Sequence, residues 1–374
     1  MDQNPLDAWG WDEIYQEEYE SLGLSPTTHC PGRIVSQRED TFTLATPHGL
    51  RWAHPAGVLF HRRAARERPG VGDWVVLESV DCEVSEGQDT VPVTHSVVDV
   101  LPRRSCFLRE APGGRGEAQV VATNVDQIFV VNAADDLNLN RIERFAVAIC
   151  GGGAEPAVIL SKGDLVPDEE LQQSLRLVAE NFPTKIPIYT THDAPTQRDE
   201  VVKSLKGALI PGRTYALVGV SGAGKSTLVN ALMEEQIQQT GEVREGDHKG
   251  RHTTSFRELF ALPNGALIMD TPGVREFALW PEGDGLNQVF ADIEELAEEC
   301  RFSDCAHATE PGCRVRQEIE SGTLSERRFL NWQSMAQETV ESQERKERRE
   351  ARKERSKFRR KVQRDKRFSK GLTR

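Results

Sequence analysis

The stretch Gly219-Val220-Ser221-Gly222-Ala223-Gly224-Lys225-Ser226-Thr227 decides the fold of this chain, because it has the form G-x-x-x-x-G-K-S. The apolar residues 215–218 precede it as a buried strand, and residues 226–233 follow it as a helix, which is the setting that this loop requires. Its glycines allow backbone N–H groups to surround phosphate oxygens, and the helix N-terminus adds a positive end. The stretch predicts a nucleoside triphosphate site in an α/β domain. The alternative is a chance glycine-rich turn.

Two side chains of this loop have specific predicted roles. Lys225 should reach the β- and γ-phosphates, whereas Ser226 offers its hydroxyl to Mg²⁺. We therefore expect the nucleotide to bind together with magnesium.

A second motif, Ser161-Lys162-Gly163-Asp164, follows the apolar strand at residues 156–160 and resembles the guanine-reading [N/T]KxD box of GTPases. In that box the Asp carboxylate, here Asp164, accepts hydrogen bonds from the N1–H and the exocyclic amine of guanine, and the Lys stem, here Lys162, lies along the base. Adenine does not present these donors, and a site built for them rejects an analogue that lacks them. Ser161 stands where the box has Asn or Thr, so its own contact is left open. A plain loop after a strand is the alternative.

The third motif is Asp270-Thr271-Pro272-Gly273, at the end of a predicted hairpin of residues 256–262 and 266–269. Asn264-Gly265 is a favoured turn pair for such a hairpin. The Asp-x-x-Gly pattern brings the carboxylate of Asp270 near the Mg²⁺ shell and the N–H of Gly273 near the γ-phosphate. We expect this loop to switch between nucleotide states.

The order of the three motifs is unusual. In ordinary small GTPases the base-reading box follows the phosphate loop, but here it precedes that loop by more than fifty residues. Domain termini lie at the surface and often near each other, so a circular permutation preserves the site. The order predicts a circularly permuted G domain.

Four residues within a short segment have the spacing C-x4-C-x-H-x5-C: Cys300, Cys305, His307 and Cys313. Four sulfur or imidazole ligands fill a tetrahedron, which is typical of one structural Zn²⁺ with no open position for catalysis. Such a metal stabilises a segment too small for its own core. Unrelated buried thiols and a disulfide are the alternatives. The remaining cysteines have no ligand spacing and are expected to be small core or surface residues.

The charge is divided unevenly along the chain. The net charge is −12, yet residues 344–374 contain sixteen Lys and Arg against five Asp and Glu. Such a basic block attracts phosphate backbones and indicates nucleic acid, while the acidic remainder favours docking at one oriented place. A charged helix or a disordered tail without a partner is the alternative.

The composition also indicates a compartment. Residues 1–7 are acidic and do not form a signal peptide, and no apolar run approaches the length of a membrane span. We expect a cytoplasmic protein with no membrane contact. Because no heptad seam occurs outside the tail, we expect a monomer.

The region before the G domain is rich in short strand-like runs, which predict a small barrel of OB type, although an SH3-like barrel has the same pattern. The basic run at residues 61–68 would be an RNA-contacting loop, and residues 9–19 are either a helix or mobile. The predicted strands are residues 32–37, 41–46, 49–54, 57–61, 73–78 and 91–101.

Residues 122–283 alternate between strands and helices, which predicts a doubly wound α/β domain. Helices at 286–299 and 314–320 would flank the cysteine cluster, and residues 324–337 lead into the basic tail. The predicted organisation is therefore an extension (1–30), an OB-type barrel (31–105), a permuted GTPase domain (106–283), a helical zinc domain (284–340) and a basic tail (341–374).

From about Gly32 to Gln337 the chain resembles the RsgA (YjeQ) family of small-subunit biogenesis GTPases. The resemblance rests on the permuted motifs and the cysteine cluster, together with residues 68–75, 101–105, 122–126 and 250–254. It implies hydrolysis of GTP to GDP and phosphate, stimulated by the 30S ribosomal subunit and its 16S rRNA during late maturation, with release on hydrolysis.

The resemblance also sharpens the expected mechanism. Val274 stands where Ras-like proteins place the glutamine that orients water, and an apolar side chain cannot position a nucleophile. His252, in the segment that matches switch I, is the candidate catalytic residue, and either Thr253 or Thr254 would complete the Mg²⁺ shell. A solvated loop histidine is the alternative for His252.

One departure from the family concerns the base site. Residues 191–193 are Thr-His-Asp where the family has a Ser-Ala-type base-contact loop, so guanine affinity could be altered. Two further functions stay open: an RNA-binding module that uses GTP only as a regulatory ligand, and an ATP-using P-loop enzyme that acts on a small molecule.

Overall fold

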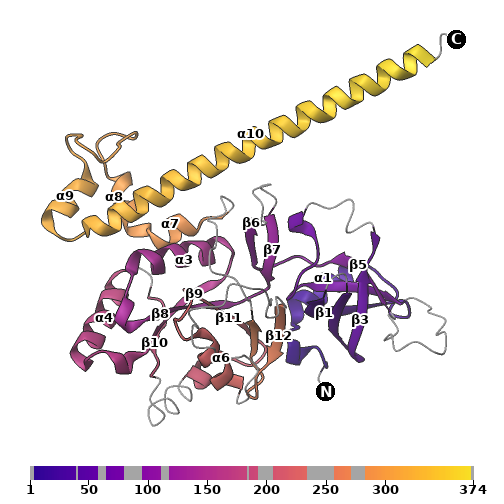
Figure 1. Ribbon diagram of the computed structural model, residues 1–374, viewed down its shortest axis with the longest axis horizontal. Helices are drawn as coiled ribbons and strands as arrows, with labels where there is room; N and C mark the ends of the chain where they lie inside the picture. The colour runs from indigo at the N-terminus through magenta and orange to yellow at the C-terminus, as the bar shows by residue number, and fades with distance from the viewer. Residues whose placement is uncertain are drawn as a thin grey trace, which may run out of the picture. The chain divides into compact units, whose positions relative to one another are not determined.

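The computed structural model describes residues 4–38, 41–57, 65–79, 95–110, 118–182, 185–192, 205–233, 257–270 and 283–371 (Figure 1). The chain forms two compact units. The first comprises the chain up to residue 278 together with residues 283–294, and the second comprises residues 279–282 and 295–374.

The α/β part of the first unit is built on five parallel strands in the order β10-β9-β8-β11-β13. Helices α3 and α6 lie on opposite sides of this sheet (Figure 1). The parallel sheet confirms the predicted doubly wound fold, in which ligands bind at the carboxyl ends of the strands. Its strands and helices are β8 (Gln127–Ala133), α3 (Leu139–Gly151), β9 (Glu155–Ser161), α4 (Asp168–Glu180), β10 (Ile188–Thr190), β11 (Thr214–Val218), α6 (Lys225–Met233) and β13 (Leu267–Asp270).

The N-terminal part of the first unit is a closed barrel. Its strands pair in the order β1-β2-β3-β5-β4, and β4 pairs back onto β1. This five-stranded ring confirms the predicted OB-type barrel. Of the six runs predicted as strands, the one at residues 57–61 lies almost wholly outside the described residues. The five strands are β1 (His29–Arg38), β2 (Thr41–Thr46), β3 (Gly49–Pro55), β4 (Trp74–Ser79) and β5 (His95–Val100).

Among the described strands, β12 (Arg257–Ala261) with β1 is the pair that joins the barrel to the sheet of the α/β part. β12 forms the predicted hairpin with β13, and it also pairs with β1 at Ser36 and Gln37. A separate hairpin of β6 (Cys106–Glu110) and β7 (Ala118–Thr123) joins the two parts in sequence. We did not predict this second hairpin.

The N-terminal segment is helical and packs on the barrel. α1 (Glu13–Ser21) begins after Asp12, whose carboxylate accepts a hydrogen bond from the Tyr15 N–H at 3.2 Å. Residues 9–19 were expected to be either a helix or mobile, and α1 agrees with the helix. Tyr15 of α1 is buried in one cluster with Leu6 and Trp11, which precede the helix, and with Trp74, Val76 and Leu101.

The helices near the cysteine cluster differ from the prediction at one point. The helix expected at residues 286–299 is two helices, α7 (Gly285–Val289) and α8 (Ala291–Glu298), because the fully buried Phe290 between them has a non-helical backbone. After α9 (Arg314–Ser321), α10 (Glu326–Gly371) begins within residues 324–337, which were expected to lead into the basic tail, and it continues through that tail.

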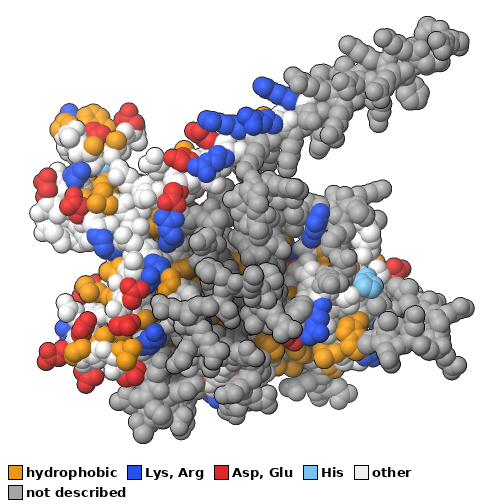
Figure 2. All heavy atoms as spheres, in the orientation of Figure 1, with side chains coloured by type: hydrophobic (Ala, Val, Ile, Leu, Met, Phe, Trp, Pro, Cys, Tyr) orange, Lys and Arg blue, Asp and Glu red, His pale blue; other side chains and the backbone are white. Residues whose placement is uncertain are grey.

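α10 is polar on its surface along the described tail. Figure 2 shows Lys and Arg side chains along it, and Arg345 and Arg348 each pair with a glutamate four residues earlier. Such pairs support an exposed helix. Among the helices of the described residues, none has the length and apolarity that a membrane crossing needs.

Candidate nucleotide site and metal centre

The phosphate loop lies between the carboxyl end of β11 and the start of α6. Gly219, Gly222 and Gly224 have φ angles of 146°, 81° and 82°, which side chains disfavour. A Cβ on Gly219 would lie 2.2 Å from the carbonyl oxygen of Val131. Glycine is therefore required at Gly219, because the loop backbone packs directly on β8.

The side chain of Lys225 lies over the loop that it belongs to. Its Nζ donates hydrogen bonds to the carbonyl oxygens of Gly219 at 2.8 Å and Val220 at 2.6 Å. Ser226 is exposed at the next position of α6, so its hydroxyl is open to a ligand. A phosphate group in the loop would offer Lys225 charged acceptors in place of these carbonyls.

An apolar core holds the loop in place. Ala223, Leu228 and Leu232 of the loop and α6 are buried in the same cluster as alternate residues of β8, β9 and β11. Within that cluster the rings of Phe129 and Tyr215 stack with their centroids 5.7 Å apart. The buried face of α6 thus fixes the helix N-terminus at the carboxyl ends of the strands.

The base-reading box contacts the phosphate loop. Ser161, at the end of β9, is buried, and its Oγ donates a hydrogen bond to the carbonyl oxygen of Ala223 at 2.8 Å. A Cβ on Gly224 would lie 3.8 Å from the Cβ of Ser161. The structure therefore brings these two predicted motifs together, and it gives Ser161 a contact to the loop backbone that the sequence left open.

The rest of the box is held by the loop that follows β10. The N–H of Gly163 donates to the carbonyl oxygen of Thr191 at 2.9 Å, and the N–H of Thr191 donates to that of Leu160 at 2.9 Å. Lys162 has a left-handed backbone with φ of 58°, which turns the chain sharply after the strand. Asp164 follows this turn at an exposed position, whereas Gly163 is buried.

Several predicted site residues cannot be placed. His252, Thr253, Thr254 and Gly273 lie outside the described residues, and of Asp270 only the backbone is described, where β13 ends opposite Glu258. Their roles in catalysis and in magnesium binding stay predictions.

A cavity of about 480 Å³ lies at the other end of the sheet and is not the nucleotide site. It is lined by Arg33, Tyr15 and Thr214, and Thr214 is at the amino end of β11. Two further pairs in its lining, Arg104 with Asp12 and Arg213 with Glu155, already neutralise each other. Ligands of doubly wound sheets bind at the opposite, carboxyl end.

Arg33 of β1 ties three parts of the first unit together beside this cavity. It donates to the carbonyl oxygens of Trp9, of Gly72 at 3.3 Å and of Asn124 at 3.0 Å. It also donates to Oγ1 of Thr214 at 2.8 Å. Burial lowers the pKa of Arg33 to about 10, because its charge is surrounded by neutral acceptors.

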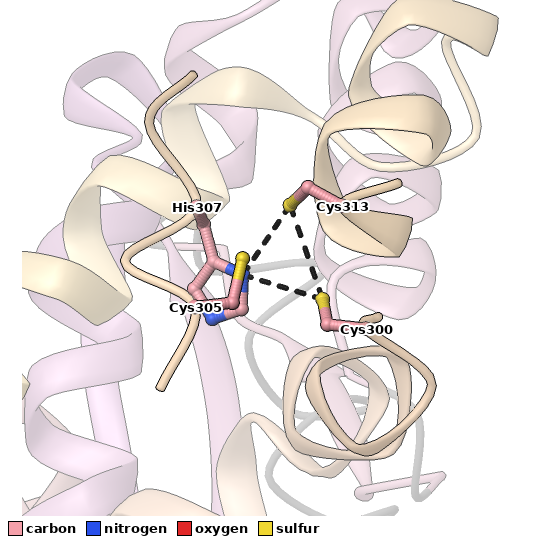
Figure 3. A group of neighbouring side chains, drawn as sticks. All are labelled: Cys300, Cys305, His307 and Cys313. Carbon is pink, nitrogen blue, oxygen red and sulfur yellow. Dashed lines mark hydrogen bonds between the residues drawn. The ribbon is translucent and has the colours of Figure 1, made fainter. Parts of the chain in front are cut away.

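The predicted cysteine cluster is assembled in the second unit (Figure 3). One ligand atom from each of Cys300, Cys305, His307 and Cys313 lies within 4.8 Å of the others. The Sγ atoms of Cys300 and Cys313 are 3.9 Å apart, and they lie 3.6 and 3.4 Å from Nδ1 of His307. Bonds of about 2.3 Å to sulfur and 2.0 Å to nitrogen would separate tetrahedral ligands by about 3.5–3.8 Å. The cluster can therefore hold a metal ion.

Backbone groups around the cluster favour thiolate ligands. The N–H of Arg314 donates to Sγ of Cys300 at 3.4 Å, and the N–H of Arg316 donates to Sγ of Cys313 at 3.5 Å. Cys313 caps the N-terminus of α9, so the positive end of that helix faces its sulfur. The rings of Phe329 and Trp332 from α10 pack around His307, with centroids 6.2 and 5.9 Å from its own.

The fold and the site together define a class of protein. A phosphate loop at the carboxyl end of a parallel sheet, in contact with a base-reading box that precedes it in sequence, defines a circularly permuted P-loop GTPase domain. In this chain that domain follows an OB-type barrel.

Comparisons with known proteins assign the family. The model of the RsgA GTPase family matches residues 100–280. A small ribosomal subunit biogenesis GTPase RsgA from Opitutus terrae is 38% identical over 337 residues, which are 89% of each chain. RsgA 1 from Oceanobacillus iheyensis is 40% identical over 309 residues, 82% of this chain and 84% of the relative. The chain belongs to the RsgA family of GTPases.

Solved structures share the fold. YjeQ from Thermotoga maritima is 24% identical with a TM-score of 0.58, over 83% of this chain and 99% of that one. YloQ, a circularly permuted GTPase, is 19% identical with a TM-score of 0.57, over 85% and 96%. An ABC transporter model also matches residues 202–372, a range that contains the phosphate loop but not the base-reading box or the barrel.

Proposed function

We propose that this GTPase acts on the small (30S) ribosomal subunit in late maturation, hydrolysing GTP with turnover that the subunit stimulates. The relatives at 38–40% identity are named small ribosomal subunit biogenesis GTPases, which supports the assignment. The observation that carries the GTP site is the hydrogen bond from Ser161 to Ala223, because it holds a guanine-type box against a phosphate loop.

Each part of the nucleotide has a proposed partner. Asp164 reads the guanine edge, while the N–H groups of the loop from Gly219 to Thr227 and the ammonium of Lys225 bind the phosphates. Ser226 and Asp270 would hold Mg²⁺, which when bound neutralises charge on the phosphate oxygens. Gly273 would sense the γ-phosphate, and His252 would supply the polar group that Val274 cannot.

The contact with the ribosome is proposed to involve RNA. α10 contains 46 residues, so at 1.5 Å per residue it spans about 70 Å. The described part of this helix has four exposed arginines along it, Arg345, Arg348, Arg352 and Arg355. These charges support binding to the phosphate backbone of 16S rRNA, with the barrel as a second contact. A cytoplasmic monomer agrees with such a role.

We also propose that the metal ion is one structural zinc. Three sulfur ligands and one imidazole are the donor set that zinc prefers, and all four positions of the tetrahedron are taken. The ion would stabilise the second unit and would take no part in hydrolysis.

The experiment that tests the function is nucleotide turnover by the purified chain, with GTP or ATP, with and without salt-washed 30S subunits. We expect hydrolysis of GTP but not ATP, and a rise on adding 30S subunits. Lys225→Ala should lower that turnover by about 100-fold or more. Lys185→Ala is the matched control, since Lys185 is exposed outside the site.

Three other outcomes would contradict the proposal. Tight GTP binding without turnover, with or without 30S subunits, would favour an RNA-binding module that uses GTP as a regulatory ligand. Turnover that 30S subunits leave unchanged would mean that the activator is not this subunit. A preference for ATP would favour a P-loop enzyme of another class.

A further inference from the structure

His307 is the imidazole of the cysteine cluster, and its backbone has an uncommon conformation. Its φ angle is 56°, in the left-handed region that few residues other than glycine adopt. Nδ1 of its ring lies 3.6 and 3.4 Å from the Sγ atoms of Cys300 and Cys313, toward which the ring points in Figure 3. Such a conformation persists only where surrounding groups fix it, so the contacts of this turn show what places the ring.

The carboxylate of Glu310 fixes the backbone on both sides of His307. Its Oε1 accepts a hydrogen bond from the N–H of Ala306 at 3.1 Å, and its Oε2 accepts from the N–H groups of Ala308 at 2.8 Å and Thr309 at 3.0 Å. Ala306 and Ala308 directly flank His307. One carboxylate thus closes the turn around the imidazole residue by charge-assisted hydrogen bonds.

The side chain of Arg316, in α9, binds His307 itself. Its Nε donates to the carbonyl oxygen of His307 at 2.8 Å, and the backbone N–H of Arg316 donates to Sγ of Cys313 at 3.5 Å. The guanidinium also lies over the ring of Phe329, 5.8 Å from the ring centroid. Arg316 therefore contacts two of the four ligand residues and is held between α9 and α10.

Neither Glu310 nor Arg316 is suited to bind the metal ion directly. A guanidinium has no acceptor atom, and both oxygens of Glu310 already accept backbone hydrogen bonds. The three sulfur atoms and the imidazole also supply the four ligands of a tetrahedron. Any effect of these two side chains on the metal must therefore pass through the residues that they hold.

We infer that Glu310 and Arg316 are positioning residues of the metal centre, which hold His307 in its left-handed backbone so that Nδ1 faces the sulfur ligands. The inference rests on the proposed metal ion and adds two residues to the four ligands. Partners that orient a metal ligand in this way typically contribute about 10- to 100-fold to metal affinity.

Competition for Zn²⁺ with a chromophoric chelator of known affinity tests the inference in the full chain. We expect Glu310→Ala and Arg316→Met each to weaken zinc binding by about 10- to 100-fold, because the turn at His307 loses a partner. Arg316→Lys keeps a donor for the carbonyl oxygen of His307, so it should recover part of the loss.

Two exposed residues that take no part in these contacts provide matched controls. Glu298→Ala removes a carboxylate from α8, and Arg176→Met removes a guanidinium from α4. Both variants should bind zinc as the wild type does. A loss of affinity in these controls as large as in Glu310→Ala and Arg316→Met would contradict a specific role for the two positioning residues.

The absorption spectrum of the Co²⁺ form tests the placement of the ring separately from affinity. The d–d bands of tetrahedral Co²⁺ depend on the identity and geometry of its ligands. His307→Ala supplies the reference spectrum without imidazole. At saturating Co²⁺, we expect the spectra of Glu310→Ala and Arg316→Met to shift from that of the wild type toward that of His307→Ala.

Two further results would overturn the inference. Wild-type zinc affinity in both Glu310→Ala and Arg316→Met would remove the two residues from the metal centre. Weaker binding with an unchanged Co²⁺ spectrum at saturation would mean that they stabilise the segment without placing the ring. Failure of the proposed metal centre looks different, because the wild type would then bind neither Zn²⁺ nor Co²⁺.

Discussion

The phosphate loop and the metal-ligand loop are both held at fixed positions, but by different interactions. The phosphate loop rests on a core cluster of buried residues that come mainly from the sheet and α6. In the segment between α8 and α9, four ligand atoms instead lie close together, and the rings of Phe329 and Trp332 pack beside them. Because the sheet supplies buried apolar area beneath the phosphate loop, glycine residues are enough to shape that loop. Where short helices supply less buried area, the four ligand atoms can hold a metal ion, which would take the place of a larger core.

Removing the metal should have the largest effect, and it should be confined to the second unit. We expect Cys313→Ser to lose about one equivalent of zinc and the protection of the segment around α9 from hydrogen exchange, because structural zinc contributes on the order of 10 kcal/mol. GTP binding by the first unit should persist. Metal analysis and hydrogen exchange of the full chain measure this.

Cys30→Ser in β1 is the matched control and should keep the zinc. Two results would contradict a separate stabilisation of the two units. One is unchanged metal content in Cys313→Ser, and the other is loss of GTP binding together with the metal.

The reciprocal change is Phe129→Ala in the core beneath the phosphate loop. Phe129 is 1% exposed and stacks on Tyr215, so its removal leaves a cavity. We expect a loss of about 3–5 kcal/mol in the free energy of unfolding of the first unit, with zinc content unchanged. Denaturant unfolding checks it, with Phe302→Ala, 41% exposed, as the control. A loss below about 1 kcal/mol would mean that the core does not hold the loop.

We expect a smaller effect from Arg33→Met, which tests how much the barrel stabilises the sheet. The change removes the donor to the buried carbonyl oxygen of Asn124 and the donor to Oγ1 of Thr214. We expect the free energy of unfolding of the first unit to fall by about 2–3 kcal/mol. Chemical denaturation measures it. Arg51→Met is the control, because Arg51 bonds only locally to Leu50, and equal effects of the two variants would contradict the prediction.

The smallest effect concerns the ion pair of Asp12 and Arg104. Burial raises the pKa of Asp12, but hydrogen bonds from Arg104 and the Tyr15 N–H outweigh it and lower that pKa below 3.8. Stability from Asp12 is therefore present above pH 3.8 and lost as the pH falls through the lowered value. Since both side chains are about 40% exposed, Asp12→Asn should cost less than about 1 kcal/mol.

Denaturant unfolding at pH 7 and near pH 2 measures this effect. The difference between Asp12→Asn and wild type should vanish at the lower pH. Glu17→Gln on α1 is the control. A difference that persists near pH 2 would assign the effect to packing of the N-terminal segment instead.

The sequence predicted the elements whose signals are local and strongly patterned. Within residues 122–283, where the sequence predicts alternating strands and helices, α4 (Asp168–Glu180) forms because its apolar residues repeat at helical spacing. The β6–β7 hairpin was missed because its strands are short and the seven residues between them exceed the two to five of common hairpin loops. The prediction of one helix at 286–299 was wrong at Phe290, since burial of that ring overrode a continuous helical pattern.

What the sequence by itself determined is local: the phosphate loop between strand and helix, the order of the motifs, and a ligand set confined to residues 300–313. Only the tertiary structure decided the contacts between distant residues. Ser161 meets Ala223 across 62 positions, Arg33 meets Thr214 across 181, and His192 lies on Gly163. Local patterns follow from backbone geometry and residue type, whereas these contacts depend on strand order in the folded sheet, which no short window contains.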